Sequence, residues 1–198
     1  MEAQTIVGSP VGEYYLGGVP ETACGLKLSE DSSFQFYFSQ GALDRFGEGK
    51  WEMRDKRIFL NSRKRPPHDF SLVESRKDAH DGISLQISEQ NEIVKRYVYA
   101  RITGGGKVQE AMANEDGLIK FEKQPIATIE LIFQFCPEKT SIFKINQAQH
   151  NYFEFKFEPW MMEIFFDNFS FGIDAENLIG GNPVLQGSAF TYRKAGEK

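Results

Sequence analysis

Residues 33–51 read SFQFYFSQGALDRFGEGKW, and Phe occupies every second position from Phe34 to Phe38. Side chains two residues apart lie on the same face of a β-strand, so the three Phe rings share one face. The stretch therefore predicts a half-buried strand. The small residues that follow, Gly41 and Ala42, indicate a bulge or a tight connection before Trp51.

The same alternation occurs in IELIFQF at 129–135 and in NYFEFKF at 151–157. Flat aromatic rings pack well on a pleated sheet, and 18 Phe, 7 Tyr and 2 Trp make the composition typical of strands. We expect an all-β chain of about a dozen strands or more. Any helix should be short, and 40–46 is the best place for a single turn. Shorter candidate strands lie at 14–16, 26–28, 50–53, 57–61, 83–87, 97–102, 118–121, 141–145, 162–166, 169–173 and 190–193.

The strands fall into groups along the chain. Residues 12–62 form a meander, whereas residues 63–82 are charged, contain Pro66-Pro67 and are interpreted as a connection. We predict a barrel-like or sandwich body from residues 1–77 and 158–198, with residues 78–157 inserted as a separate β-sandwich. A simple tandem pair of domains is the alternative.

Charge and apolar runs limit the partners. The net charge is −5 and the pI is about 5.3, so the chain lacks the cationic excess that neutralises phosphates or anionic lipids. We expect no nucleic-acid partner and no membrane insertion. The first fifteen residues lack a basic and an apolar leader region. This predicts a cytoplasmic protein as written, or a periplasmic or secreted one if a leader was removed.

Cysteine and histidine are scarce. Cys24 and Cys136 have apolar neighbours, which favours buried thiols over the alternative of one disulfide bridge. No two of His68, His80 and His150 stand at i, i+2 or i, i+4, and each is interpreted as a solvated loop residue. We predict no metal site and no cofactor.

Residues 41–51 are the most distinctive stretch for ligand binding. Asp44 and Arg45 are candidates for the mouth of a barrel, and Trp51 is a candidate for the floor of an apolar pocket. In the alternative interpretation, the stretch is a structural bend and Trp51 fills one end of the core.

No sequence motif predicts catalysis. The run Gly104 to Lys107 lacks the spacing of a phosphate-binding loop and is interpreted as a hairpin, and G-x-S-x-G does not occur. We name no catalytic residue. The leading hypothesis is a non-enzymatic β-protein that binds a protein partner or an apolar small molecule. The alternatives are a hydrolase with dispersed acid and base residues, such as Ser, His and Asp from separate places, and a purely structural or assembly protein.

Two resemblances add to this interpretation. The elements Gly12 to Gly18, Gly41 to Asp44 and Gly49 to Trp51 resemble the opening of a group of uncharacterised bacterial all-β proteins, and their spacing is similar to that of lipocalin-like barrels. The stretch NEDGLIKF at 114–121 resembles the turn of transthyretin-like and carboxypeptidase-regulatory domains. These resemblances imply a lipocalin-like body with a transthyretin-like middle domain and bring no established activity.

Overall fold

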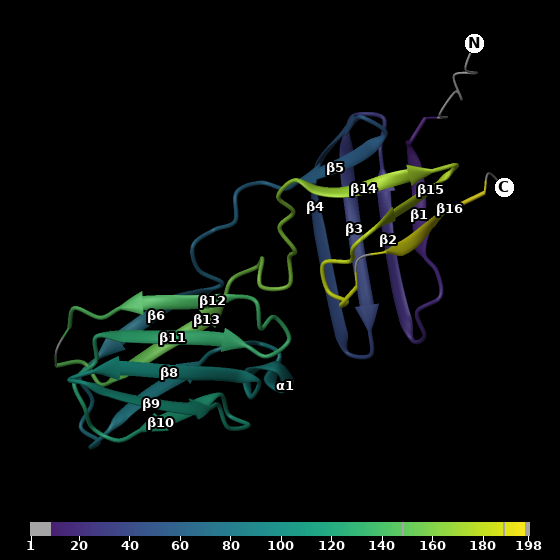
Figure 1. Cartoon of the computed structure of the whole chain (residues 1–198). Helices are drawn as coiled ribbons and strands as arrows, with labels where there is room; N and C mark the ends of the chain where they lie inside the picture. The colour runs from purple at the N-terminus through teal and green to yellow at the C-terminus, as the bar shows by residue number, and fades with distance from the viewer. Residues whose placement is uncertain (1–8, 148, 188, 197–198) are drawn as a thin grey trace, which may run out of the picture. The chain divides into compact units, whose positions relative to one another are not determined.

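The computed structural model describes residues 9–147, 149–187 and 189–196, and within them nearly all of the regular secondary structure is β-strand (Figure 1). The chain divides into two compact units. Residues 1–65 and 162–198 form the first unit, and residues 66–161 form the second. The expectation about a leader, that the first fifteen residues lack one, concerns in part residues 1–8, which lie outside the described residues.

The first unit is a closed barrel of eight strands, which confirms the prediction that the two ends of the chain build one β-body. Every neighbouring pair is antiparallel, and β16 pairs with β1 to close the sheet. In chain order, the barrel is therefore an up-and-down meander. Its strands are β1 (Gly12–Leu16), β2 (Thr22–Leu28), β3 (Ser33–Gln40), β4 (Leu43–Arg54), β5 (Arg57–Asn61), β14 (Phe169–Asp174), β15 (Asn177–Gly180) and β16 (Phe190–Lys194).

The interior of the barrel is filled by side chains. Phe34, Phe36 and Phe38 of β3 are buried as their alternation predicts. Phe166, which precedes β14, places its ring edge-on to Phe34 and Phe36 at 5.2 and 5.3 Å between centroids. Gly47 of β4 makes room for this ring, because a Cβ there would lie 2.6 Å from Phe166 Cε2. The aromatic surplus of the sequence is thus used in the barrel core.

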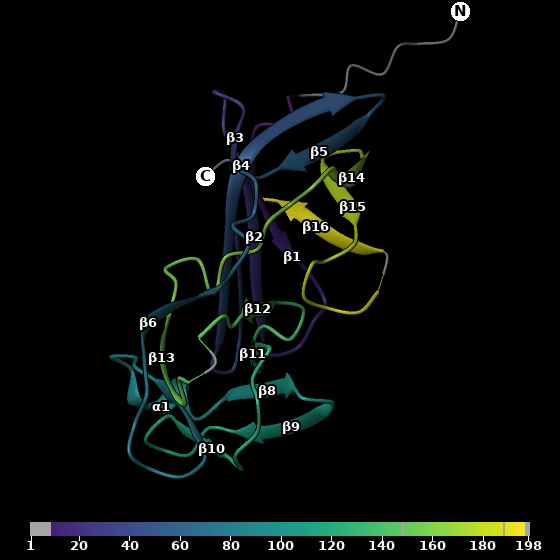
Figure 2. The ribbon, with the colours of Figure 1, turned by 90° about the vertical axis from the view of Figure 1, so that its left-hand side faces the viewer.

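The second unit contains two four-stranded sheets, in the orders β10-β7-β13-β6 and β12-β11-β8-β9. Figure 2 shows the paired strands β6 and β13 side by side. Rings from the two sheets contact each other, as in Phe133 with Phe157 and Phe143 with Phe155, each pair at 4.9 Å between centroids. One short helix, α1 (Glu92–Lys95), leads into β8. The strands are β6 (Phe70–Arg76), β7 (Ile83–Ile87), β8 (Val98–Gly104), β9 (Lys107–Met112), β10 (Leu118–Phe121), β11 (Thr128–Phe133), β12 (Thr140–Lys144) and β13 (Tyr152–Phe157).

The charged segment 63–82 is only in part the connection that the sequence indicates. Its residues 70–76 form β6, an edge strand that pairs with β13, so the second unit begins at Pro66 rather than near residue 78. Asp69 is buried, with a carboxylate oxygen 3.3 Å from the ammonium of buried Lys139. Burying this charge together with a partner lets a charged segment enter the unit.

Two local predictions are wrong. Residues 40–46 form the hairpin between β3 and β4 instead of a helical turn, and the helix of the described chain is α1. Residues 162–166 form no named strand and make only an isolated bridge between Phe46 and Glu163. The run GGGK is the tight hairpin between β8 and β9, as expected.

Cys24 and Cys136 are both buried and form no disulfide, as their apolar neighbours indicate. Inside the barrel, the Nδ2 group of buried Asn182 donates to Cys24 Sγ at 3.4 Å and to the Tyr192 hydroxyl at 2.9 Å. Burial raises the pKa of the Cys24 thiol to about 11, although the hydrogen bonds oppose that shift.

We predict that Cys24 resists alkylation in the native protein. At pH 9 an ordinary thiol with a pKa of roughly 8.5 is mostly thiolate, whereas Cys24 stays protonated because burial raises its pKa to about 11. Peptide mass spectrometry after iodoacetamide treatment at pH 9 should show Cys24 modified only when the protein is unfolded in guanidinium. Rapid native modification of Cys24 would contradict the buried-thiol interpretation.

Candidate functional site

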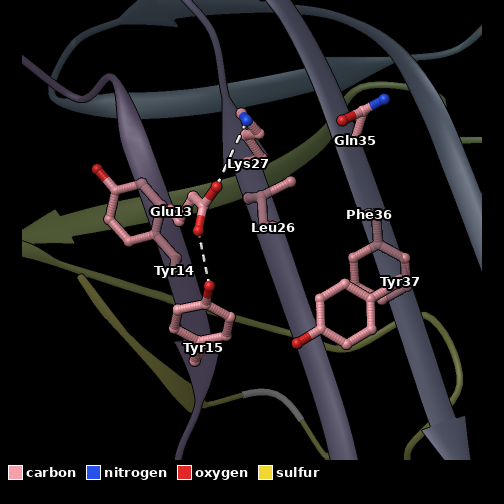
Figure 3. A pocket seen from close by; sticks show the side chains of 8 residues that line it. All are labelled: Glu13, Tyr14, Tyr15, Leu26, Lys27, Gln35, Phe36 and Tyr37. Carbon is pink, nitrogen blue, oxygen red and sulfur yellow. Dashed lines mark hydrogen bonds and ion pairs between the residues drawn. The ribbon is translucent and has the colours of Figure 1, made fainter. Parts of the chain in front are cut away.

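A hollow of about 390 Å³ lies on the outer face of the barrel, over β1, β2 and β3 (Figure 3). Tyr15 stands opposite Gly25 in the β1–β2 pair, and Gly25 stands opposite Tyr37 in the β2–β3 pair. Directly opposed residues share a face of the sheet, so the three positions form one row across the strands. Gly25 contributes no side chain between the two tyrosine rings.

The glycine and the second ring fit each other closely. A Cβ built on Gly25 would lie 2.9 Å from Tyr37 Cζ, so the ring rests directly on the strand backbone. An aromatic ring that covers a strand glycine stabilises the sheet, which is one role of Tyr37. Tyr15 and Tyr37 nevertheless remain 43% and 44% exposed. Their rings are therefore both held by the sheet and accessible to a ligand.

Polar groups line one side of this hollow. The Tyr15 hydroxyl donates to Glu13 at 2.7 Å, and the Lys27 ammonium lies 3.4 Å from the other oxygen of Glu13. These contacts lower the pKa of the Glu13 carboxyl, the hydrogen bond from Tyr15 having the largest effect, and the same bond raises the pKa of Tyr15. The Gln35 amide and the Tyr37 hydroxyl also line the hollow and make no hydrogen bond with any described residue.

A third exposed aromatic residue lies on the next strand of the barrel. Phe46 of β4 stands opposite Tyr37 and is 44% exposed. Tyr15, Tyr37 and Phe46 thus lie on one face of four adjacent strands, with Gly25 between the first two. We call these three residues the aromatic row. Aromatic residues are enriched at protein interfaces, and accessible rings grouped in this way are typical of a binding surface.

The structure does not bring Asp44, Arg45 and Trp51 together. Asp44 is exposed on the outer face of β4, whereas Arg45 is buried on the inner face opposite Phe38 and donates from Nε to the Met162 carbonyl at 3.1 Å. Trp51 lies six residues further along the strand, roughly 20 Å at the usual rise per residue. Ligand binding by any of the three stays a prediction.

Trp51 is half-buried and packs against the barrel core. Its indole Nε1 donates to the Ser29 carbonyl at 3.0 Å, and its backbone amide donates to the Ser32 carbonyl at 2.9 Å. These contacts tie the end of β4 to the turn between β2 and β3. The core interpretation of Trp51 therefore has direct geometric support.

Sequence reasoning missed the hollow. The available signal was Tyr37, an aromatic residue at an outward position of an otherwise alternating strand. Its role in the hollow could not be predicted, because it depends on Gly25 standing opposite it on another strand. Among the described residues, no group of three or more His, Cys, Asp or Glu side chains is arranged to hold a metal ion. The same part of the chain contains no helix long and apolar enough to cross a membrane.

No family model, no curated protein and no solved structure matches this chain. The class of protein is accordingly given by the fold itself: a closed eight-stranded β-barrel with a second unit of two four-stranded sheets.

We predict that Trp51→Ala lowers the free energy of unfolding by about 3 kcal/mol, the lower end of the range for a truncated core Trp, because the indole is half-buried. Chemical denaturation in a Trp160→Phe background measures this, with Trp51→Phe as the milder control. In that background Trp51 should emit to the blue of free indole and resist acrylamide quenching. Unchanged stability together with a readily quenched, red-shifted emission would contradict a core role.

Proposed function

We propose that the barrel is a non-enzymatic binding domain and that it holds a proline-rich segment of a partner protein in the hollow lined by Tyr15 and Tyr37. The observation that carries the proposal is the pair of accessible rings with a glycine between them. Proline-rich segments in the polyproline II conformation dock in grooves lined by aromatic side chains.

The hydrogen-bonding groups of the hollow suit such a segment. A polyproline II chain makes no internal hydrogen bonds, so its carbonyl oxygens are available to donors. The Tyr37 hydroxyl, the Gln35 amide and the Lys27 ammonium are donors that line the hollow. Proline rings can lie flat on the two tyrosines while these groups bind the carbonyls. The conformational entropy that the segment loses on binding is small, because proline already restricts the backbone of the unbound segment.

Other modes of protein recognition fit the barrel less well. A closed barrel has no free sheet edge, so a partner cannot add a strand to it. An amphipathic helix needs a continuous apolar groove, whereas Glu13, Lys27 and Gln35 make one side of this hollow polar. The residues that line it include no His, Ser or Cys, which favours binding over catalysis at this place.

We also propose family relationships for the two units and for the chain. We place the barrel with lipocalin-like proteins because its eight strands follow one another as an antiparallel meander that closes on itself. We likewise propose that the middle domain is transthyretin-like and that the chain is bacterial. The turn at 114–117, where Asn114 Oδ1 accepts from the amides of Asp116 and Leu118, supports the transthyretin-like assignment. The bacterial assignment is supported by the resemblance of the opening elements between Gly12 and Trp51.

We predict that a short polyproline peptide binds the full chain and that Tyr37→Ala weakens binding by about tenfold or more, the usual effect of losing a central aromatic contact. Isothermal titration calorimetry gives the affinity, and amide chemical shifts should change on β1 to β3. Met53→Ala is the matched control, because Met53 is an exposed apolar residue of the barrel outside the hollow.

Tyr37→Phe separates the hydroxyl from the ring and should lose less affinity than Tyr37→Ala. Melting temperatures of all variants show whether any loss reflects unfolding. Absence of peptide binding would refute the proposal. Binding of an apolar dye that Tyr37→Ala abolishes, without peptide binding, would show that the hollow takes an apolar small molecule instead.

A further inference from the structure

A second hollow, of about 370 Å³, lies on the second unit over the outer face of β7. Ser84 of β7 stands opposite Lys120 of β10 on one side and opposite Tyr152 of β13 on the other. The loop before β7 brings Asp78 and His80 to the same hollow. A hydroxyl, an imidazole and a carboxylate therefore line one small space.

The imidazole of His80 lies between the Ser84 hydroxyl and the Asp78 carboxylate. Ser84 Oγ lies 3.0 Å from His80 Nε2, and His80 Nδ1 lies 3.6 Å from Asp78 Oδ2. A carboxylate beside Nδ1 favours the tautomer that carries its proton there. The lone pair of Nε2 then faces the Ser84 hydroxyl, which donates to it. This is the order of groups by which a histidine base activates a serine nucleophile.

Hydrogen bonds from one distant residue hold the loop in this shape. Asn151 Oδ1 accepts from the Asp78 amide at 2.6 Å, while Asn151 Nδ2 donates to the carbonyls of His80 and Gly82 at 3.0 and 3.1 Å. The Asn151 carbonyl accepts from the Ser84 amide at 2.8 Å. Gly82 makes the turn at φ +106°, a conformation that side chains disfavour. The loop is thus preorganised, as a reactive site requires.

We propose that Ser84 is a nucleophile activated by His80 and positioned through Asp78, and that the second unit hydrolyses small carboxylic esters. Ser84 Oγ attacks the ester carbonyl and His80 Nε2 takes the hydroxyl proton. The C–O bond of the ester breaks, and the alcohol leaves with that proton. Water, deprotonated by the same imidazole, then cleaves the acyl-serine to release the acid and restore the hydroxyl.

The neighbours of Ser84 fit this substrate class. Lys120 stands opposite Ser84 in the sheet register and lines the same hollow, so its positive charge can stabilise the charge that develops on the carbonyl oxygen. Leu118 and Phe121 supply an apolar wall for a short acyl chain. Ser84 itself is only 6% exposed, so a bulky acyl group has no room beside it. A small ester therefore fits the site better than a long-chain lipid or a protein.

A second Ser–His pair in the same unit serves as an internal control for the reactivity of Ser84. In this pair, Ser75 Oγ lies 2.9 Å from His150 Nδ1. Within the described residues, no carboxylate forms an ion pair with His150. This second pair has the Ser–His hydrogen bond but no carboxylate beside the imidazole. We therefore expect that Ser75 does not react as a nucleophile.

The test uses the full chain with p-nitrophenyl acetate as substrate and a fluorophosphonate as label, which phosphonylates an activated serine with loss of fluoride. Wild type and Ser75→Ala should hydrolyse the ester at equal rates and carry one label, on Ser84 by peptide mass spectrometry. Ser84→Ala should fall to the buffer rate and take no label. His80→Gln should lower the rate by about a hundredfold or more, the usual contribution of a general base.

Asp78→Asn tests the positioning role, because it should lower kcat while leaving KM and the melting temperature unchanged. Melting curves of every variant exclude loss of folding as the cause. Hydrolysis that survives Ser84→Ala, a label on another serine, or no label on the folded wild type would each overturn the proposal. None of these results depends on the Tyr37 hollow, so the two proposals fail separately.

Discussion

The pairing of β16 with β1 is the constraint on which the barrel depends. It joins the first and last described strands, with Tyr15 opposite Arg193 and Leu16 opposite Tyr192. Without it, both strands would be sheet edges and the interior would open to water. The 66–161 unit leaves the barrel after β5 and returns before β14, and those two strands pair directly with each other. The insertion therefore interrupts no barrel pairing.

A closed and filled barrel also decides where a ligand can bind. Phe34, Phe36, Phe38 and their neighbours occupy the interior, so the accessible aromatic side chains are those at outward positions of the strands. Because outward positions on neighbouring strands line up in register, Tyr15 and Tyr37 become a pair only through the glycine between them. The missing side chain of this glycine leaves room for the Tyr37 ring, which lies directly on the strand backbone at the edge of the hollow.

Much of the fold was predictable because strand alternation is a local signal. Phe at every second position indicated β3, and the strands predicted before and after the charged segment indicated one β-body built from the two ends of the chain. The strand β6 was missed since it is an edge strand, where Leu72 and Val73 are both exposed and break the alternation. The four-residue strand β15 was missed because turn-forming residues surround it.

The candidate sites were less predictable, for a different reason. Asp78, His80 and Ser84 lie within seven residues of sequence, but the sequence analysis interpreted His80 as a solvated loop residue. Their geometry could not be predicted, because it depends on the turn at Gly82 and on Asn151, which binds the loop from a position distant in sequence. Tyr37 likewise needs its opposite residue on another strand. In both places the local sequence supplies the reactive or aromatic groups, while contacts distant in sequence bring those groups to one place.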